Sequence, residues 1–336
     1  MPTLAADELR EVTTTAFRRV HVPEQDARLI ADLLVQANLA GHDSHGVVRI
    51  PSYIEAVKNG QIRPGTEIKI SEETSTSACL RGGDNFGQVV LKRGAEQALE
   101  KSAHSPISMV TVTDYSHCGQ LGTYAQMLAA ENRIGMVLLG KQRGVVVPWG
   151  GRRGRLYQNT LALAIPSRKP FPLVLDMATS IAPFGKILLQ QARNEPCPAG
   201  WIIDAEGNPS TDPHLNFSGG EGGILPLGAP LAAQKGSGLS FFLGLLVTAL
   251  SGCSSAGEGS LIIAMNPTIC TTMECFLDEV DSYIEYLHET PPAPGFEQVL
   301  APGERSYNET QRRLREGIYV EPETWARIQA LAVAPC

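Results

Sequence analysis

The sequence lacks several features that would place the protein in a familiar class. No apolar run comes near the roughly 20 residues that a membrane-spanning helix needs, so we expect no membrane association. Acidic residues outnumber basic ones by 35 to 28, whereas nucleic-acid-binding proteins carry a basic excess, so we expect no nucleic-acid partner. The N-terminal segment shows no basic stretch followed by an apolar one. It does not resemble a secretory signal, and we expect a cytoplasmic protein.

The usual cofactor and metal motifs are also missing. No predicted strand is followed by Gly-x-Gly-x-x-Gly, the phosphate-binding turn of the common dinucleotide-binding fold. No Walker-type loop, His-Glu-x-x-His pair or Gly-x-Ser-x-Gly elbow occurs, which excludes the ordinary nucleotide hydrolases, zinc hydrolases and α/β-hydrolases. The seven cysteines are scattered and include no Cys-x-x-Cys pair, so we expect reduced thiols and no bound metal.

The remaining pattern is that of a globular protein with 43% hydrophobic residues in a chain of 336. Apolar residues at helical spacing predict helices at 3–20, 24–41, 88–103, 123–133, 236–252, 273–289 and 322–332. Short apolar runs bounded by turn residues predict strands at 63–70, 76–83, 107–115, 134–140, 160–166, 171–179 and 260–267. Residues 196–223 are expected to form loops, and 290–307 an extended segment. Strands in the middle with helices at both ends predict an α+β, or mixed α/β, fold.

The stretch GHDSHGVVRIPSYIEAVKNG at 41–60 gathers groups that are suited to handling a proton and an anion. If Ser44 caps a helix, the positive helix end lowers the pKa of His45, and a histidine near neutrality passes protons well. Arg49, four residues later, shares that face and binds carboxylates through two parallel hydrogen bonds. Pro51 belongs in a first helical turn, so we expect the regular helix to start near residue 50. From this stretch alone, a capped helix with solvated charges is the favoured interpretation of the same residues.

Further segments follow this stretch in order: SHCGQLGTYAQMLAAENRIGMV, VPWGGRRGRLYQNTLALAIP, LVLDMATSIAPFGKI, PAGWIIDAEGNPSTDP, ILPLGAPLAAQKGSGLS and APGER. In these segments the chain resembles the type-2 malate/L-lactate dehydrogenase family over most of residues 30–310. The resemblance implies a homodimeric oxidoreductase that uses NADP or NAD, with NADPH slightly favoured. It implies hydride transfer to or from a small 2-oxo/2-hydroxy acid or a cyclic imino acid. It also implies a cofactor domain at 66–284 that is not a Rossmann fold and has a largely antiparallel sheet, with a helical domain at 1–65 and 285–336.

The resemblance implies roles for individual residues. His45 is the expected proton donor and acceptor with Ser44 supporting it, and Arg49 is the expected clamp for the substrate carboxylate. His117 corresponds to a histidine that some members use as the base, and a structural loop histidine is the alternative. Thr179 could offer a hydroxyl group to the cofactor. Cofactor contacts are implied for Cys118, Gly119, Gln120, Leu121, Gly122, Asp176, Met177, Ala178, Gln234, Lys235, Gly303, Glu304 and Arg305.

Three positions depart from the family's pattern. Gln234 stands where the family has a histidine, so it can form hydrogen bonds but cannot carry charge. Gln158, an expected substrate contact, stands where the family has a threonine. Lys186 resembles the malate/lactate-type members, whereas KGSGLS at 235–240 leans toward the imino-acid reductases. The sequence leaves open a 2-oxo acid, a cyclic imino acid, and a member that has lost redox chemistry and acts as a lyase or isomerase.

Overall fold

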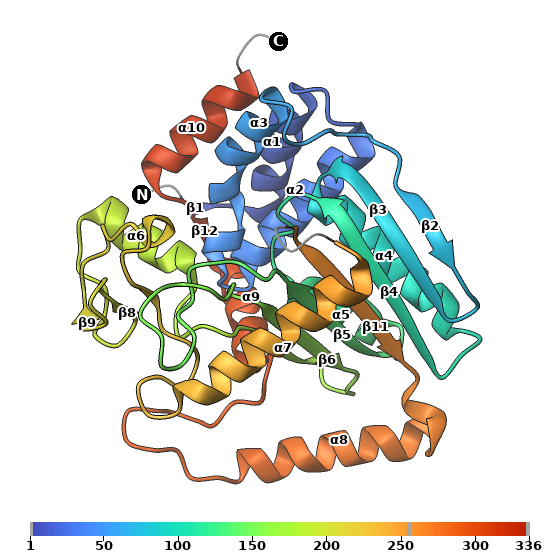
Figure 1. Ribbon diagram of the computed structural model, residues 1–336. Coiled ribbons are helices and arrows are strands. Elements are labelled where there is room, and N and C mark those ends of the chain that lie inside the picture. Colours follow the sequence, from blue (N-terminus) through green and yellow to red (C-terminus); the bar gives the residue numbers. More distant parts are fainter. Residues whose placement is uncertain (1–2, 254–256, 334–336) are drawn as a thin grey trace.

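A seven-stranded sheet forms the centre of the protein, and the computed structural model describes residues 3–253 and 257–333 (Figure 1). In spatial order the strands are β2 (Lys69–Glu73), β3 (Ser77–Asn85), β4 (Ile107–Tyr115), β11 (Gly259–Met265), β5 (Ile134–Gly140), β6 (Thr160–Ile165) and β7 (Leu173–Ala178). Neighbouring strands are antiparallel except β3 and β4, which are parallel. The structure confirms the predicted mixed α/β fold and its largely antiparallel sheet.

Helices cover both faces of this sheet. Helices α4 (Gly87–Ser102) and α5 (Gly122–Ala130) pack on one face, and α7 (Ala233–Ser251) packs on the other (Figure 1). The central strands are buried from both sides, which explains why they appear in the sequence as continuous apolar runs. On the α4–α5 side the core contains Val110, Val137 and Ile262, and on the α7 side Leu138 and Leu261.

The two chain ends pack together beside the sheet. Their elements are α1 (Ala6–Arg18), α2 (Glu24–Leu39), α3 (Ile50–Lys58), α10 (Pro322–Val333) and the antiparallel pair of β1 (Thr3–Leu4) and β12 (Ile318–Tyr319). They share an apolar core that includes Phe17, Ile30, Ile54, Ile318 and Ile328. The exact domain boundaries at residues 65 and 285 stay a prediction.

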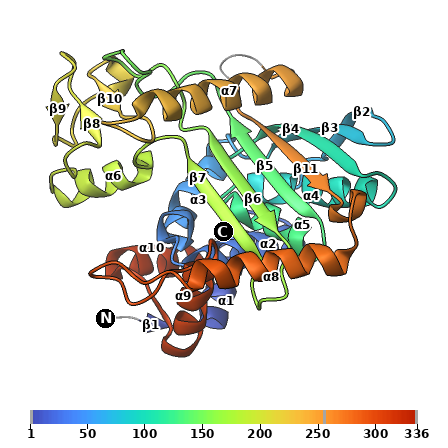
Figure 2. The ribbon, with the colours of Figure 1, turned by 90° about the horizontal axis from the view of Figure 1, so that it is seen from below.

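The remaining elements lie around the sheet's edges. A small lobe contains α6 (Phe184–Arg193), β8 (Ile202–Ile203), β9 (Pro209–Ser210) and β10 (Gly223–Ile224), so the predicted loop at 196–223 holds three short strands. Helix α8 (Met273–His288) runs along the outside of the molecule (Figures 1 and 2). After an extended segment, helix α9 (Glu304–Glu316) follows, although the sequence predicts no helix there. Helix α6 was also missed.

Two findings concern membranes and thiols. Among the helices that the structure describes, none is long and apolar enough to cross a bilayer. Six of the seven cysteines lie in the described residues, and each of the six is a free thiol, as expected. Cys336 lies outside the described residues.

Candidate active site

Several strand ends meet at one edge of the central sheet. Strands β4, β5 and β7 end there, while β6 and β11, which run the opposite way, begin there. The segments next to these strand ends therefore lie close together although they are far apart in the sequence. They carry His117, Lys141, Gln158, Thr179 and Glu258.

The loop between α2 and α3 carries His45 and Arg49. Residues Asp43–His45 and Val47–Arg49 form two short 3₁₀ turns, and α3 begins at Ile50, which confirms the expected helix start. The expectation that Ser44 caps a helix is wrong, because Ser44 lies inside the first 3₁₀ turn. Its hydroxyl instead lies 3.1 Å from Nδ1 of His45, and its carbonyl accepts a 2.7 Å hydrogen bond from Nε of Arg49. Ser44 thus contacts both predicted site residues.

Hydrogen bonds among Asn38, Asp43 and Arg313 fix the position of this loop. The buried Asn38 donates to the Asp43 carboxylate at 2.7 Å and accepts from the backbone N–H of Val47 at 2.8 Å. Arg313 on α9 donates to both carboxylate oxygens of Asp43, at 2.6 and 3.1 Å, and to the Asn38 carbonyl at 2.7 Å. Bidentate arginine–carboxylate pairs fix orientation as well as distance. Helix α9 therefore orients the loop that carries His45.

Gly46 is the tightest point of this arrangement. A Cβ atom at Gly46 would lie only 2.1 Å from Oδ1 of Asn38, which is buried and hydrogen-bonded. We expect Gly46→Ala to lower the free energy of unfolding by about 1–3 kcal/mol, as overpacking does. Urea unfolding measures the change. Gly238→Ala is the matched control, because nothing lies within 4 Å of its Cβ position in α7; equal urea midpoints for Gly46→Ala and the wild type would contradict the prediction.

His45 and His117 come together as a stacked pair. Their ring centroids are 5.8 Å apart with 23° between the planes. Nδ1 of His117 lies 2.6 Å from the Tyr53 hydroxyl and accepts the backbone N–H of Gly119 at 3.2 Å. The Tyr53 hydroxyl in turn accepts a 3.0 Å hydrogen bond from the buried Gln88 amide. Sequence reasoning missed Tyr53 and Gln88, since each fits an apolar or polar position of an ordinary helix.

Both histidines are neutral at pH 7. Removal from bulk water, followed by the positive charge of Arg49, lowers the pKa of His45 to about 4. The same two causes, in the same order, lower the pKa of His117 further. The sequence predicted a lowered pKa for His45 but from the wrong cause, since the effect comes from desolvation and Arg49 rather than from a helix end. A neutral imidazole can accept a proton from a substrate hydroxyl.

Arg49 reaches from the terminal helices to the small lobe. An ideal Cβ atom on Gly185, in the first turn of α6, would lie 3.7 Å from Nη2 of Arg49. The charge of Arg49 is also felt by the hydroxyl of Tyr157, whose pKa it lowers against the larger, opposing effects of burial and Glu258. Arg49 therefore lies between the histidine pair and the strand-end segments.

A carboxylate that sequence reasoning missed lies at the same edge. Glu258 accepts a hydrogen bond from the Tyr157 hydroxyl, and burial raises the pKa of Glu258. The Lys141 ammonium lies 5.7 Å from the centre of the Tyr157 ring. Gln158, the expected substrate contact, donates instead to the Ser180 hydroxyl and the Ala182 carbonyl, both at 3.1 Å.

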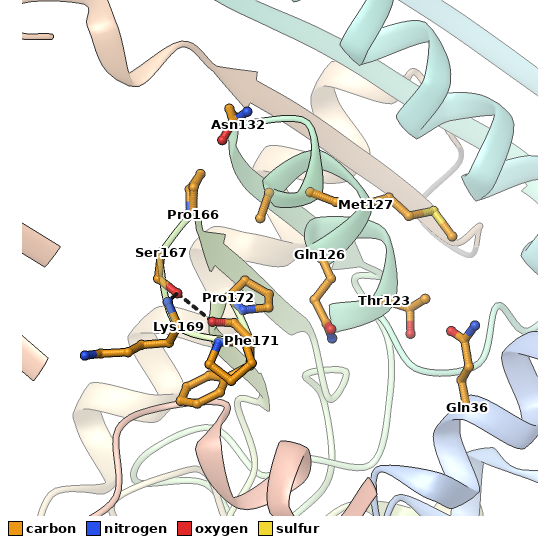
Figure 3. Close-up of a pocket in the computed structure, with 13 residues that line it drawn as sticks. Gln36, Thr123, Gln126, Met127, Asn132, Pro166, Ser167, Lys169, Phe171 and Pro172 are labelled. Atoms are coloured by element: carbon orange, nitrogen blue, oxygen red, sulfur yellow. Dashed lines mark hydrogen bonds between the residues drawn. The ribbon is translucent and has the colours of Figure 1, made fainter. Parts of the chain in front are cut away.

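Four of the thirteen predicted cofactor residues line one cleft. A cavity of about 560 Å³ is lined by Gln120, Asp176, Gly303 and Arg305, together with His42. It adjoins a second cavity of about 600 Å³, with which it shares Gln126 and residues 170–172. Figure 3 shows the second cavity between α2, α5 and the segment that joins β6 to β7. Together they form one long cleft, whose lining includes Gln120, three residues after His117 in the sequence.

Asp176, which lines this cleft, is hydrogen-bonded to the first residue of helix α5. Its Oδ2 accepts the backbone N–H of Gly122 at 2.7 Å, and Gln120 also hydrogen-bonds the carboxylate. Burial raises the pKa of Asp176 to about 6, against these hydrogen bonds, which lower it. Met177 and Ala178 complete β7 toward the site edge. The structure therefore brings Gln120, Gly122 and Asp176 together, and their contacts with a cofactor stay a prediction.

The other predicted cofactor residues divide into three groups. The side chains of Cys118 and Leu121 are packed in the sheet's core, which leaves only their backbone for a ligand. Gln234 and Lys235 lie exposed in the first turn of α7 and do not line the long cleft. Glu304 accepts the N–H of Ala301 and contacts His288, both at 2.9 Å, so it shapes the start of α9. Arg305 lines the cleft beside that helix start.

The comparison with known proteins decides the family. A family model described as malate/L-lactate dehydrogenase matches residues 4–329. The chain belongs to the malate/L-lactate dehydrogenase family. The prediction made from the motifs is therefore confirmed, and the protein is an oxidoreductase.

Individual relatives of the malate/L-lactate dehydrogenase family match over nearly their whole length. An L-sulfolactate dehydrogenase of Methanothermobacter thermautotrophicus is 33% identical over 342 residues, covering 98% of this chain and 96% of its own. An L-lactate dehydrogenase of Cupriavidus necator is 32% identical over 341 residues, covering 96% and 95%. The crystal structure of malate dehydrogenase from Entamoeba histolytica aligns with a TM-score of 0.94 and 28% identity over 98% of this chain and 97% of that one. These names support a hydroxy-acid oxidoreductase that uses a nicotinamide cofactor.

Proposed function

We propose that the protein transfers a hydride reversibly between a nicotinamide cofactor and a small 2-hydroxy/2-oxo acid. The observation that carries this proposal is the meeting of a neutral histidine pair, His45 and His117, with the positive charge of Arg49 beside the strand-end segments. A 2-hydroxy acid offers a carboxylate and, on the next carbon, a hydroxyl whose proton must leave. Arg49 suits the first group and a neutral imidazole suits the second.

The long cleft suits the cofactor in size and charge, and a third supporting feature lies outside its lining. Its two cavities of about 560 and 600 Å³ adjoin, as an extended dinucleotide requires. Arg305 and the start of α9 offer positive charge to a phosphate group. The Thr179 hydroxyl, buried at the site edge, has no hydrogen-bond partner among the described residues. Residues 118–122, 176–178 and 303–305 are the segments that we propose to hold the cofactor.

Each residue then has one task in the oxidation direction. When bound, the oxidised nicotinamide accepts the hydride from the carbon that carries the hydroxyl. Arg49 fixes the substrate carboxylate, and this positioning contributes through proximity. Nε2 of His45 accepts the hydroxyl proton. Nδ1 of His45 keeps its own hydrogen and donates it in a hydrogen bond to the Ser44 hydroxyl. In the reduction direction a protonated His45 returns the proton to the new oxygen.

A panel of cofactors and acids tests this proposal. Purified protein is mixed with NADH or NADPH and 2-oxo acids, or with NAD or NADP and malate, lactate or sulfolactate, and the absorbance of the reduced nicotinamide is followed. We expect turnover with at least one 2-hydroxy/2-oxo acid pair. Turnover of a cyclic imino acid alone would overturn the substrate class, and cofactor binding without any turnover would favour the lyase or isomerase interpretation.

We also propose a homodimer that forms through α7. The outward face of this helix exposes Phe241, Phe242, Leu245, Leu246 and Leu250, and Phe242 alone is 69% exposed. Contiguous apolar patches of this kind mark contact surfaces in water-soluble proteins. The helix carries no charge after its first turn, so a second copy of the same face is an apolar partner that brings no unpaired charge.

Phe242→Glu is expected to convert the dimer into a monomer, because it places two carboxylates in an apolar interface. Size-exclusion chromatography with light scattering gives the mass. Tyr283→Glu is the matched control, since Tyr283 is 70% exposed on α8, away from the proposed face. A monomeric wild type, or a Phe242→Glu variant that stays dimeric, would contradict this interface.

A further inference from the structure

The two stacked histidines differ in what faces their Nδ1 atoms. We propose that His117 acts as a fixed hydrogen-bond donor to the reacting oxygen of the substrate and not as the base, with Tyr53 and Gln88 as positioning residues. This inference rests on the proposed function and assigns the proton transfer to His45 alone. It therefore decides between the two candidate bases that the sequence left open.

The Gly119 backbone determines which nitrogen of His117 carries hydrogen. Its N–H points at Nδ1 over 3.2 Å, and a backbone N–H can only donate. Nδ1 must therefore be the bare, accepting nitrogen, and the Tyr53 hydroxyl at 2.6 Å donates to it as well. The hydrogen of the neutral ring then sits on Nε2, on the ring edge away from Tyr53. His117 is desolvated enough to lower its pKa but keeps exposed surface, through which a ligand can reach the ring.

The orientation of the Gln88 amide supports this conclusion. Its Nε2 donates to the Tyr53 oxygen at 3.0 Å, which leaves the Tyr53 hydrogen free to point at Nδ1 of His117. A reversed amide would draw that hydrogen to Gln88 and leave the Tyr53 oxygen and a bare Nδ1 without a hydrogen between them, so the bare Nδ1 requires the amide orientation seen here. Tyr53 and Gln88 are both buried, and they hold the ring in place.

His45 lacks such a constraint. Its Nδ1 lies 3.1 Å from the Ser44 hydroxyl, which can either donate or accept. Nδ1 of His45 can therefore keep its hydrogen on Ser44 while Nε2 gains and loses a proton. His117 cannot do the same. Its ring would need a second hydrogen, placed on Nδ1, and that hydrogen would collide with the N–H of Gly119. The lowered pKa of His117, caused by desolvation and by Arg49, acts in the same direction by disfavouring its cation.

The step in the reduction direction balances as follows. A bound reduced nicotinamide would supply a hydride, with its electron pair, to the carbonyl carbon and would itself be oxidised. The π electrons of the carbonyl move to oxygen, which takes a proton from Nε2 of protonated His45. Throughout, the Nε2–H of His117 donates to the same oxygen and keeps its hydrogen. Donors aimed at a developing oxyanion stabilise the transition state in this way.

Two variants of His117 separate a donor from a base. Glutamine keeps an N–H donor but cannot take up a proton. Alanine has no side-chain donor and cannot take up a proton either. We expect His117→Ala to lose about 10²–10³-fold in kcat, as when an oxyanion donor is removed, and His117→Gln to stay at least about tenfold above it. The pH inflection from His45 should persist in His117→Gln. Equal losses in both variants, with that inflection gone, would overturn the proposal.

Nitrogen-15 NMR of histidine-labelled wild-type protein tests the same point without turnover. The signals of His117 are assigned by their loss in His117→Gln. We expect a bare Nδ1 and a protonated Nε2 at pH 7. A hydrogen on Nδ1 would overturn the proposal, and this readout does not require that any acid of the panel be turned over.

For Tyr53→Phe we expect a lower kcat with an unchanged KM for the cofactor; an unchanged kcat would remove Tyr53 as a positioning residue.

Discussion

His45→Ala is expected to lower kcat by about 10²–10⁴-fold, the usual contribution of a positioned acid–base group. The affinity for the nicotinamide cofactor should stay unchanged, because the cleft residues that we propose to hold it are Gln120, Asp176 and Arg305. Turnover follows from the absorbance of the reduced nicotinamide, and the dissociation constant of the cofactor from its fluorescence on titration with protein. A loss in kcat alone indicates that His45 acts in the chemical step.

Two controls sharpen the result for His45. His104→Ala removes an exposed histidine just before β4 and should leave kcat unchanged. Ser44→Ala should lower kcat less than His45→Ala does, because it removes only the hydroxyl that supports Nδ1. Full turnover in His45→Ala would take His45 out of the mechanism.

Arg49→Lys is expected to lower kcat/KM for the acid by about 10–100-fold, since a hydrogen bond to a charged group is worth about 1.5–3 kcal/mol. Lysine keeps the positive charge but loses the planar fork that grips both carboxylate oxygens. It also loses the 2.7 Å hydrogen bond from Nε of Arg49 to the Ser44 carbonyl. Steady-state kinetics with varied acid and saturating cofactor measure the change.

The variant Arg49→Met tests the pH dependence of the oxidation rate. The charge of Arg49 lowers the pKa of His45, so its removal should raise that pKa from about 4 toward the ordinary value. Oxidation needs neutral His45, so its rate rises with pH through this pKa and levels off above it. The inflection should therefore move to higher pH in Arg49→Met and stay low in Arg49→Lys, which keeps the charge. An inflection at the same pH in all three proteins would contradict the contact between Arg49 and the histidine pair.

The sequence predicted the strands better than the polar helices. Each central strand is a continuous apolar run because it is buried on both faces, and that signal is local. Helix α9 has the sequence ERSYNETQRRLRE, with few apolar residues to reveal a buried face. It is held mainly by polar contacts such as that of Arg313 with Asp43, two residues that are 270 positions apart. Local periodicity carries no trace of such a contact.

The candidate site shows the same division. His45 and Arg49 were found because they lie only four positions apart. A proton-transfer group and a carboxylate-binding group can therefore be recognised in one short stretch of sequence. Tyr53 and Gln88 were missed because their roles depend on His117, which lies 64 positions after Tyr53 and reaches it only through the fold. The motif resemblance supplied the cofactor segments at 118–122, 176–178 and 303–305, and three-dimensional structure was needed to show that members of all three line one cleft.

The most direct test of the central claim follows the hydride itself. A reduced nicotinamide cofactor carrying deuterium at both C4 positions is turned over with the 2-oxo acid that the panel selects, and the product is analysed by mass spectrometry and NMR. We predict one deuterium on the carbon that bears the new hydroxyl, for the wild type and, at a much lower rate, for His45→Ala. Product without deuterium at that carbon, or no product from any acid offered, would contradict the account.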